Sequence, residues 1–140
     1  EGMSMFFGVS GFVFGSIVFR EILMDINDTQ GDQAAHVYTL PVVIGRPLAL
    51  LFSLFSLTLG CFCGIQHLLH GSITQRLMHI LPPSISLAIP VSIFCAVISP
   101  MYISALSVWI SRFDKTRLLQ TIDAVMIYIA LGFVSIVSLT

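Results

Sequence analysis

Charged residues are absent from four long stretches of this chain, and each stretch is rich in apolar side chains. Aspartate, glutamate, lysine and arginine are all missing from positions 2–19, 47–75, 77–111 and 124–140. A helix that crosses a bilayer needs about 20 mainly apolar residues. The pattern therefore predicts four membrane-spanning helices, at about 2–19, 47–69, 84–110 and 120–139.

Prolines shape the third of these segments. Pro82 and Pro83 favour a late start of its helix, whereas Pro90 and Pro100 fall inside it, where they remove backbone hydrogen bonds and favour kinks. None of the four stretches shows the sustained alternation of polar and apolar residues that is typical of membrane strands. The predicted fold class is all-α, a polytopic bundle of four transmembrane helices.

The overall composition agrees with a membrane protein and excludes most soluble classes. Of the 140 residues, 56% are hydrophobic and 9% are charged, whereas soluble domains carry about 25% charged residues. The net charge of −1 provides no basic surface for nucleic acid. We therefore expect an integral, multi-pass protein that is surrounded by membrane lipid and has no nucleic-acid partner.

The basic residues are distributed unevenly among the three connections between the predicted helices. Five of the six border the first and third connections, which lie on one side of the membrane, and only Arg76 lies in the second. Because lysine and arginine are enriched in cytoplasmic loops, the first and third connections are predicted to face the cytoplasm-equivalent side. A plastid, a bacterial-type inner membrane and an archaeal membrane are all compatible with this pattern.

The N-terminal segment does not resemble a signal peptide. It opens with Glu1 instead of a basic stretch, and no small-residue cleavage pattern follows it. Because the chain starts without methionine and enters a span almost directly, we expect further sequence before Glu1. Within the span, Gly8, Gly11 and Gly15 recur at steps of three and four, which predicts a small-residue face for close helix packing.

Four of the seven acidic residues are concentrated in the first connection, residues 20–46. Glu21, Asp25, Asp28 and Asp32 recur at steps of four, three and four, so a continuing helix would place all four carboxylates on one face. Like charges in this arrangement repel one another, and a bound cation would offset the repulsion. Mg²⁺ is the natural candidate because it prefers carboxylate oxygens and is often shared with substrate phosphates.

Two other interpretations apply to this acidic stretch. Its carboxylates can be solvated connection residues that bind nothing, and this alternative stays open. An EF-hand calcium loop fits badly. Counted from Asp25, the position that requires glycine holds Gln30, and the twelfth position holds His36 instead of glutamate.

Residues 20–46 resemble the second aspartate-rich motif of the UbiA superfamily of intramembrane prenyltransferases. The similarity is greatest to the branch that contains the geranylgeranylglyceryl-phosphate, chlorophyll and homogentisate prenyltransferases. The matching elements are Arg20-Glu21, then Asp25-x-x-Asp28-x-x-x-Asp32 with Gly31 before the last aspartate, then Thr39-Leu40-Pro41-Val42-Val43 and Gly45. The four predicted helices are similar to the last four of that family.

The resemblance implies a nine-helix fold in which two acidic motifs face each other across a cavity. Nothing in this chain matches the first motif, Asn-Asp-x-x-Asp-x-x-x-Asp. The resemblance thus implies the C-terminal half of an enzyme whose missing N-terminal half carries that motif. The implied activity is Mg²⁺-dependent transfer of an isoprenyl group from a prenyl diphosphate to a lipophilic, in several relatives aromatic, acceptor in quinone, tocopherol, chlorophyll or prenyl-lipid biosynthesis.

The resemblance also implies roles for individual residues. Asp28 and Asp32, with Asp25 next, are the expected catalytic carboxylates and Mg²⁺ ligands, although Asp25 can instead pair with an arginine. Arg20 and Arg46 are the expected substrate-binding cations, which would contact diphosphate oxygens. Snorkelling at a helix end is the alternative for both.

Tyr38 departs from the family pattern, in which a basic or small polar residue is common at this position. We expect Tyr38 to bind substrate, either by stacking on the acceptor or by facing the carbocation through its ring. Packing within the connection is the alternative.

Two functions from other classes stay open beside prenyl transfer. A transporter or channel segment could use the acidic stretch to sense cations, and its flux would not consume prenyl diphosphate. A non-catalytic membrane subunit would pair with another chain without turnover.

Overall fold

The chain folds into six helices over residues 2–70 and 72–138, which the computed structural model describes. In chain order they are α1 (Gly2–Ala34), α2 (Leu40–Ile44), α3 (Arg46–His70), α4 (Ser72–Met78), α5 (Pro83–Ile110) and α6 (Lys115–Ser138). The described residues contain no strand, so the all-α prediction is confirmed.

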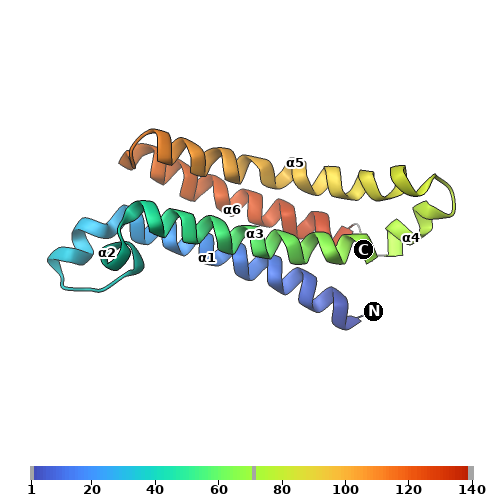
Figure 1. Cartoon of the computed structure of the whole chain (residues 1–140), viewed down its shortest axis with the longest axis horizontal. Helices are drawn as coiled ribbons and strands as arrows, with labels where there is room; N and C mark the ends of the chain where they lie inside the picture. The colour runs from blue at the N-terminus through green and yellow to red at the C-terminus, as the bar shows by residue number, and fades with distance from the viewer. Residues whose placement is uncertain (1, 71, 139–140) are drawn as a thin grey trace.

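Four of the helices, α1, α3, α5 and α6, are long and apolar enough to cross a membrane. They run side by side as an elongated bundle, and α2 and α4 are short helices at its opposite ends (Figure 1). This arrangement is compatible with the predicted multi-pass membrane bundle. The C-terminal part of α1, α2 and the α5–α6 turn share one end, as expected for the first and third connections.

The helix boundaries differ from the predicted spans mainly in α1. The helix does not stop near residue 19 but continues through Ala34, and α2 occupies five more residues of the 20–46 connection. Residues 20–34 therefore continue the first helix, the case that the spacing of the acids raised, whereas α2 was not predicted. The helix α4 was not predicted either. Helix α5 begins at Pro83, as the paired prolines indicated. Position 139, at the end of the fourth predicted span, lies outside the described residues.

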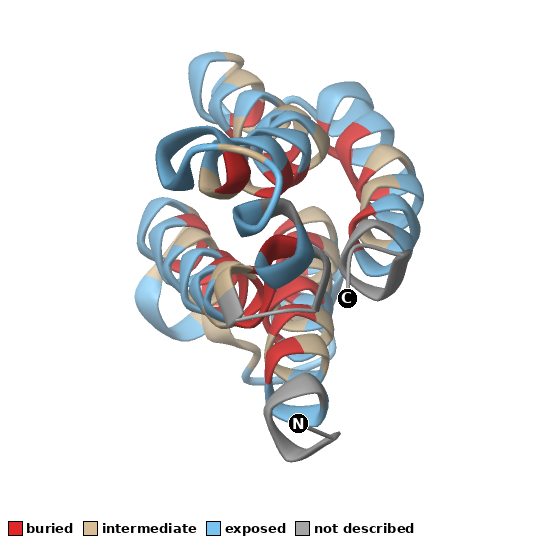
Figure 2. Ribbon diagram, turned by 90° about the vertical axis from the view of Figure 1, so that its right-hand side faces the viewer, coloured by how far each residue is buried: buried red, intermediate tan, exposed pale blue. Residues whose placement is uncertain are grey.

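The core lies between the four long helices, whose buried residues line their inward sides (Figure 2). Phe12 of α1 meets Phe94 of α5 edge to face, with ring centroids 5.3 Å apart. A Cβ added to Gly132 of α6 would lie 2.4 Å from the Phe12 ring. Glycine at position 132 thus makes room for the phenylalanine that joins three helices.

Helices α1 and α3 approach one another through small residues. A Cβ on Gly15 would lie 2.6 Å from the Ser56 carbonyl oxygen and 2.9 Å from the Gly60 Cα. Added Cβ atoms on Gly8 and Gly11 would similarly meet His67 and Cys63. The predicted small-residue packing face is confirmed, and it holds α1 in one position along α3.

Candidate functional site

The acidic stretch forms the last turns of α1, beyond the length that a membrane requires. With 33 residues, α1 is about 50 Å long, whereas a hydrocarbon core is about 30 Å thick. A bilayer placed on the uncharged residues 2–19 would leave the part of α1 after Arg20 outside the hydrocarbon. Ile22, Leu23 and Ile26 remain buried against the bundle, which holds this extension in place.

The four carboxylates follow one another along this extension of α1. Glu21 and Asp28 are exposed, and Asp25 and Asp32 are half-buried. Burial raises the pKa of Asp25 above its ordinary value, and the carboxylates of Asp32, Glu21 and Asp28 raise it further. The expected repulsion between carboxylates of one helix face thus acts on Asp25, in addition to its burial.

Asp32 joins α1 to α2 through its side chain. Its Oδ2 accepts a hydrogen bond from Thr39 Oγ1 at 2.9 Å. The chain reverses between the two residues because His36 adopts a φ of 58° and the Val37 N–H donates to the Asp32 carbonyl at 2.8 Å, as in a helix C-cap. The hydrogen bond between Thr39 and Asp32 therefore brings the Thr-Leu-Pro segment into contact with the end of the acidic pattern.

Thr39 has a role that the sequence did not single out. It is the N-cap residue of α2, yet its side chain does not cap that helix, because the hydroxyl donates to Asp32 instead. Pro41, in the first turn of α2, is buried. A threonine two residues before a proline and seven after an aspartate is the signal that could have indicated this contact.

The two arginines expected to bind diphosphate lie in different surroundings. Arg20 Nη1 donates to Glu21 Oε1 at 2.6 Å, so Arg20 pairs with Glu21 and not with Asp25. Its Nε is buried and has no partner within the described part of the chain. Arg46 is the first residue of α3 and is half-buried. No carboxylate of the described residues lies within ion-pair distance of it.

Tyr38 lies in the turn between α1 and α2, at the same end as the carboxylates. Its side chain is 82% exposed, so packing within the connection does not explain its presence. A substrate-binding role for Tyr38 stays a prediction.

The carboxylates do not form a ready-made metal cage. Across residues 2–70 and 72–138, no three side chains of histidine, cysteine, aspartate or glutamate are grouped to hold one ion. For the expected ligands helix geometry explains this, because Asp25 and Asp32 lie about 10 Å apart along the axis. One or two neighbouring carboxylates can still hold Mg²⁺ when phosphate oxygens and water complete its shell. Binding of Mg²⁺ by Asp28 and Asp32 stays a prediction.

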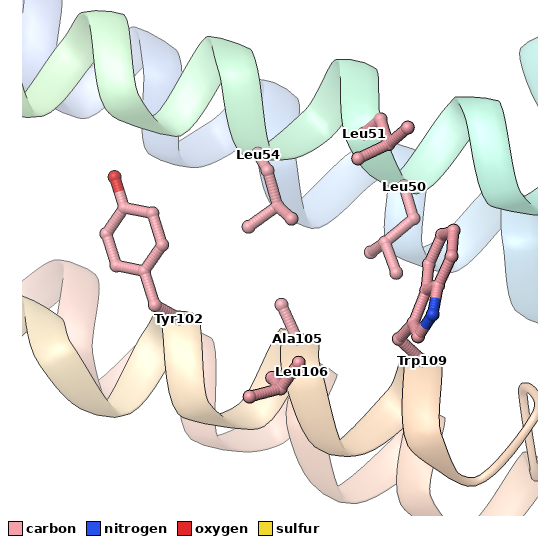
Figure 3. Close-up of a pocket in the computed structure, with 7 residues that line it drawn as sticks. All are labelled: Leu50, Leu51, Leu54, Tyr102, Ala105, Leu106 and Trp109. Carbon is pink, nitrogen blue, oxygen red and sulfur yellow. The ribbon is translucent and has the colours of Figure 1, made fainter.

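An apolar cavity of about 330 Å³, which was not predicted, lies between α3 and α5 (Figure 3). Its lining consists of leucines from α3 and of aromatic and aliphatic residues from α5. Helix α3 contributes Leu50, Leu51 and Leu54, and α5 contributes Tyr102, Ala105, Leu106 and Trp109. At one end the Tyr102 hydroxyl and Thr58 Oγ1 share a hydrogen bond of 3.0 Å. The cavity thus has a polar contact beside one end, and its other end lies near the start of α3 and the end of α5.

Comparison with protein-family models, curated proteins and solved structures gives no match to this chain. Its function is therefore inferred from the geometry of the acidic end and from the motif that residues 20–46 resemble.

Proposed function

We propose that this chain provides the second acidic motif of a UbiA-type intramembrane prenyltransferase, which transfers an isoprenyl group from its diphosphate to a lipophilic acceptor. The observation that carries the proposal is the Asp32–Thr39 hydrogen bond, which joins the two parts of the motif at the end of α1. A preceding half of the enzyme would provide the first motif.

The proposed diphosphate site uses the carboxylates through a metal ion. A diphosphate is strongly negative, and carboxylates alone would repel it. Asp28 and Asp32 are the proposed Mg²⁺ ligands, with Asp25 as the third carboxylate. Bound Mg²⁺ would supply charge neutralisation and orientation of the leaving group. Of the two arginines, Arg20 lies on the same helix as the carboxylates and is the first candidate for a direct diphosphate contact, with Arg46 second.

The proposed reaction balances with these groups. The allylic carbon–oxygen bond breaks, and its electron pair leaves with the diphosphate. An electron-rich atom of the acceptor forms the new bond to the allylic carbon, and the acceptor then loses a proton. The acidic end would hold the charged part of the substrate, while the apolar bundle keeps the isoprenyl chain out of water. Tyr38 is the proposed contact for the acceptor.

Binding of farnesyl diphosphate to vesicles that contain the chain tests the diphosphate site. With Asp28→Asn or Asp32→Asn, we expect Mg²⁺-dependent binding to fall by about tenfold or more, the loss typical of a perturbed metal site. Asp123→Asn is the matched control, because Asp123 is exposed on α6 and outside the motif. Binding that is unchanged in both motif variants, or that resists EDTA, would exclude these ligands.

Transfer itself is tested by reconstituting the chain with a separately expressed segment that carries the first motif. We expect Mg²⁺-dependent prenylation of an acceptor such as homogentisate with the wild-type chain and none with Asp32→Asn. Ion or solute flux without release of diphosphate would instead assign the chain to transport. Complex formation with neither binding nor flux would assign it to a non-catalytic subunit.

A further inference from the structure

The cavity between α3 and α5 opens sideways, toward what surrounds the bundle. Leu51, Leu106 and Trp109 are 52%, 57% and 43% exposed, whereas Leu50 and Ala105 behind them are fully buried. An opening between two helices that can span a membrane is suited to an acyl chain, because its lining offers apolar contacts. At about 330 Å³, the space lies within the range of ligand pockets.

Two arginines, Arg46 and Arg112, lie close in sequence to the residues that line one end of this groove. Arg46 precedes Leu50 by one helical turn and Leu54 by two, so all three share the face of α3 that borders the groove. Arg112 follows α5, and its backbone N–H donates to the Trp109 carbonyl at 3.1 Å. Neither arginine has a carboxylate within ion-pair distance among the described residues.

Three carboxylates of the same end have partners of their own. Glu21 pairs with Arg20 on α1, and Asp32 accepts from Thr39. Asp114, the nearest acid to Arg112 along the chain, accepts from the Arg117 backbone N–H at 3.2 Å. Because none of these contacts involves the Arg46 or Arg112 side chain, both cations can be offered to an anion.

The groove also has a defined depth. From Trp109 to Tyr102 it follows seven residues of α5, or about 10 Å, and the Tyr102–Thr58 hydrogen bond lies beside its far end. An apolar chain can enter for this distance below a surface that carries two cations.

From these observations we infer that the α3–α5 groove is a binding site for an anionic glycerophospholipid. One acyl chain lies between the leucines of α3 and the α5 row, and the headgroup phosphate lies between Arg46 and Arg112. The inference goes beyond the proposed function. It gives Arg46 a lipid headgroup in place of the diphosphate, for which Arg20 is the first candidate.

Trp109 is the only tryptophan of the chain, so its fluorescence reports on this groove alone. The 140-residue chain is placed in phosphatidylcholine vesicles with small amounts of dibrominated phosphatidylglycerol or dibrominated phosphatidylcholine, since bromine quenches tryptophan on contact. We expect phosphatidylglycerol to reach half-quenching at a mole fraction about fivefold lower, the factor that one basic side chain contributes near an anionic lipid.

Two pairs of variants test the site. Arg46→Gln and Arg112→Gln should each reduce the preference for phosphatidylglycerol, whereas Arg76→Gln, an exposed arginine at the opposite end, should keep it. Leu51→Phe should weaken quenching by both lipids because it narrows the groove. Leu59→Phe is its control on the same helix, with a similar exposed fraction of 56%.

Three outcomes would overturn the inference. Equal quenching by both lipids in the wild type would mean a non-selective lipid shell. An unchanged preference in both Arg46→Gln and Arg112→Gln would remove the headgroup site. Recovery of Trp109 fluorescence on addition of farnesyl diphosphate would assign the groove to the substrate. Failure of Mg²⁺-dependent diphosphate binding would leave the lipid inference intact, because that assay reads Asp28 and Asp32.

Discussion

The two halves of α1 belong to one continuous helix but differ in packing and in charge. In the apolar half, glycines bring its backbone into contact with α3, so that no Cβ can be added at Gly15 without displacing backbone atoms. In the acidic half, Gly31 has no atom within 4 Å of an added Cβ, and carboxylates repel one another. The first half is arranged for packing. The second half carries carboxylates that repel one another and do not contribute to packing. Such a cost in stability is expected at a binding site.

The same substitution in the two halves should give opposite results. We expect Gly15→Ala to destabilise the bundle by about 2 to 3 kcal/mol, because its methyl group would overlap the Ser56 carbonyl. Gly31→Ala should stabilise it by about 0.5 to 1 kcal/mol, the difference in helix propensity. Thermal unfolding in detergent, followed by circular dichroism, measures both. Equal effects would mean that the two halves do not differ in packing.

Loss of the Thr39 hydroxyl should act on the acidic half alone. Thr39→Val removes the donor to Asp32, and we expect it to cost about 1 to 2 kcal/mol and to lower Mg²⁺-dependent binding of farnesyl diphosphate several-fold. Thr39→Ser, which keeps the hydroxyl, is the control. Normal diphosphate binding by Thr39→Val would show that the hydrogen bond from Thr39 to Asp32 is not needed for that binding.

Removal of one charge should stabilise the acidic half at neutral pH. Because the pKa of Asp25 is raised in the fold, its ionised form is disfavoured there, and Asp25→Asn should gain about 0.5 kcal/mol or less, since water screens a partly exposed group.

The gain from Asp25→Asn should depend on pH and on Mg²⁺. It should be complete well above the raised pKa and should vanish only when the pH is well below the ordinary value of 3.8, where Asp25 is protonated in both the folded and the unfolded state. Saturating Mg²⁺ should abolish it as well. Melting curves of the wild type and the variant from about pH 7 to about pH 2.5, with and without Mg²⁺, measure the difference. A constant difference would show that Asp25 is not strained by its neighbours.

Charge-free stretches were sufficient to predict the long helices, because the membrane requirement acts on each segment separately. They could not predict where α1 ends. Charges end the part that lies in hydrocarbon, but they do not end a helix. With no proline before Pro41, and with Ile22, Leu23 and Ile26 continuing the buried face, α1 runs on to the reversal at His36.

The two candidate sites differ in how far the sequence could predict them. Spacing alone placed the carboxylates on one helix face, since all four belong to one helix. The contact between Asp32 and Thr39 required the turn geometry after α1. The α3–α5 groove depends on how two helices that are distant in sequence are rotated against each other. The sequence around Leu50 or Trp109 does not predict how α3 and α5 are rotated against each other.

An unbroken α1 also makes the acidic end sensitive to chain length. A residue inserted between Phe19 and Glu21 would turn every following carboxylate by about 100° and move it by about 1.5 Å along the axis, while the glycines hold the preceding turns against α3. Asp32 would then point away from Thr39. In a flexible loop the same insertion would be absorbed. Because α1 is one continuous helix, the number of its residues sets both the position of the carboxylates along the helix axis and the direction in which they point.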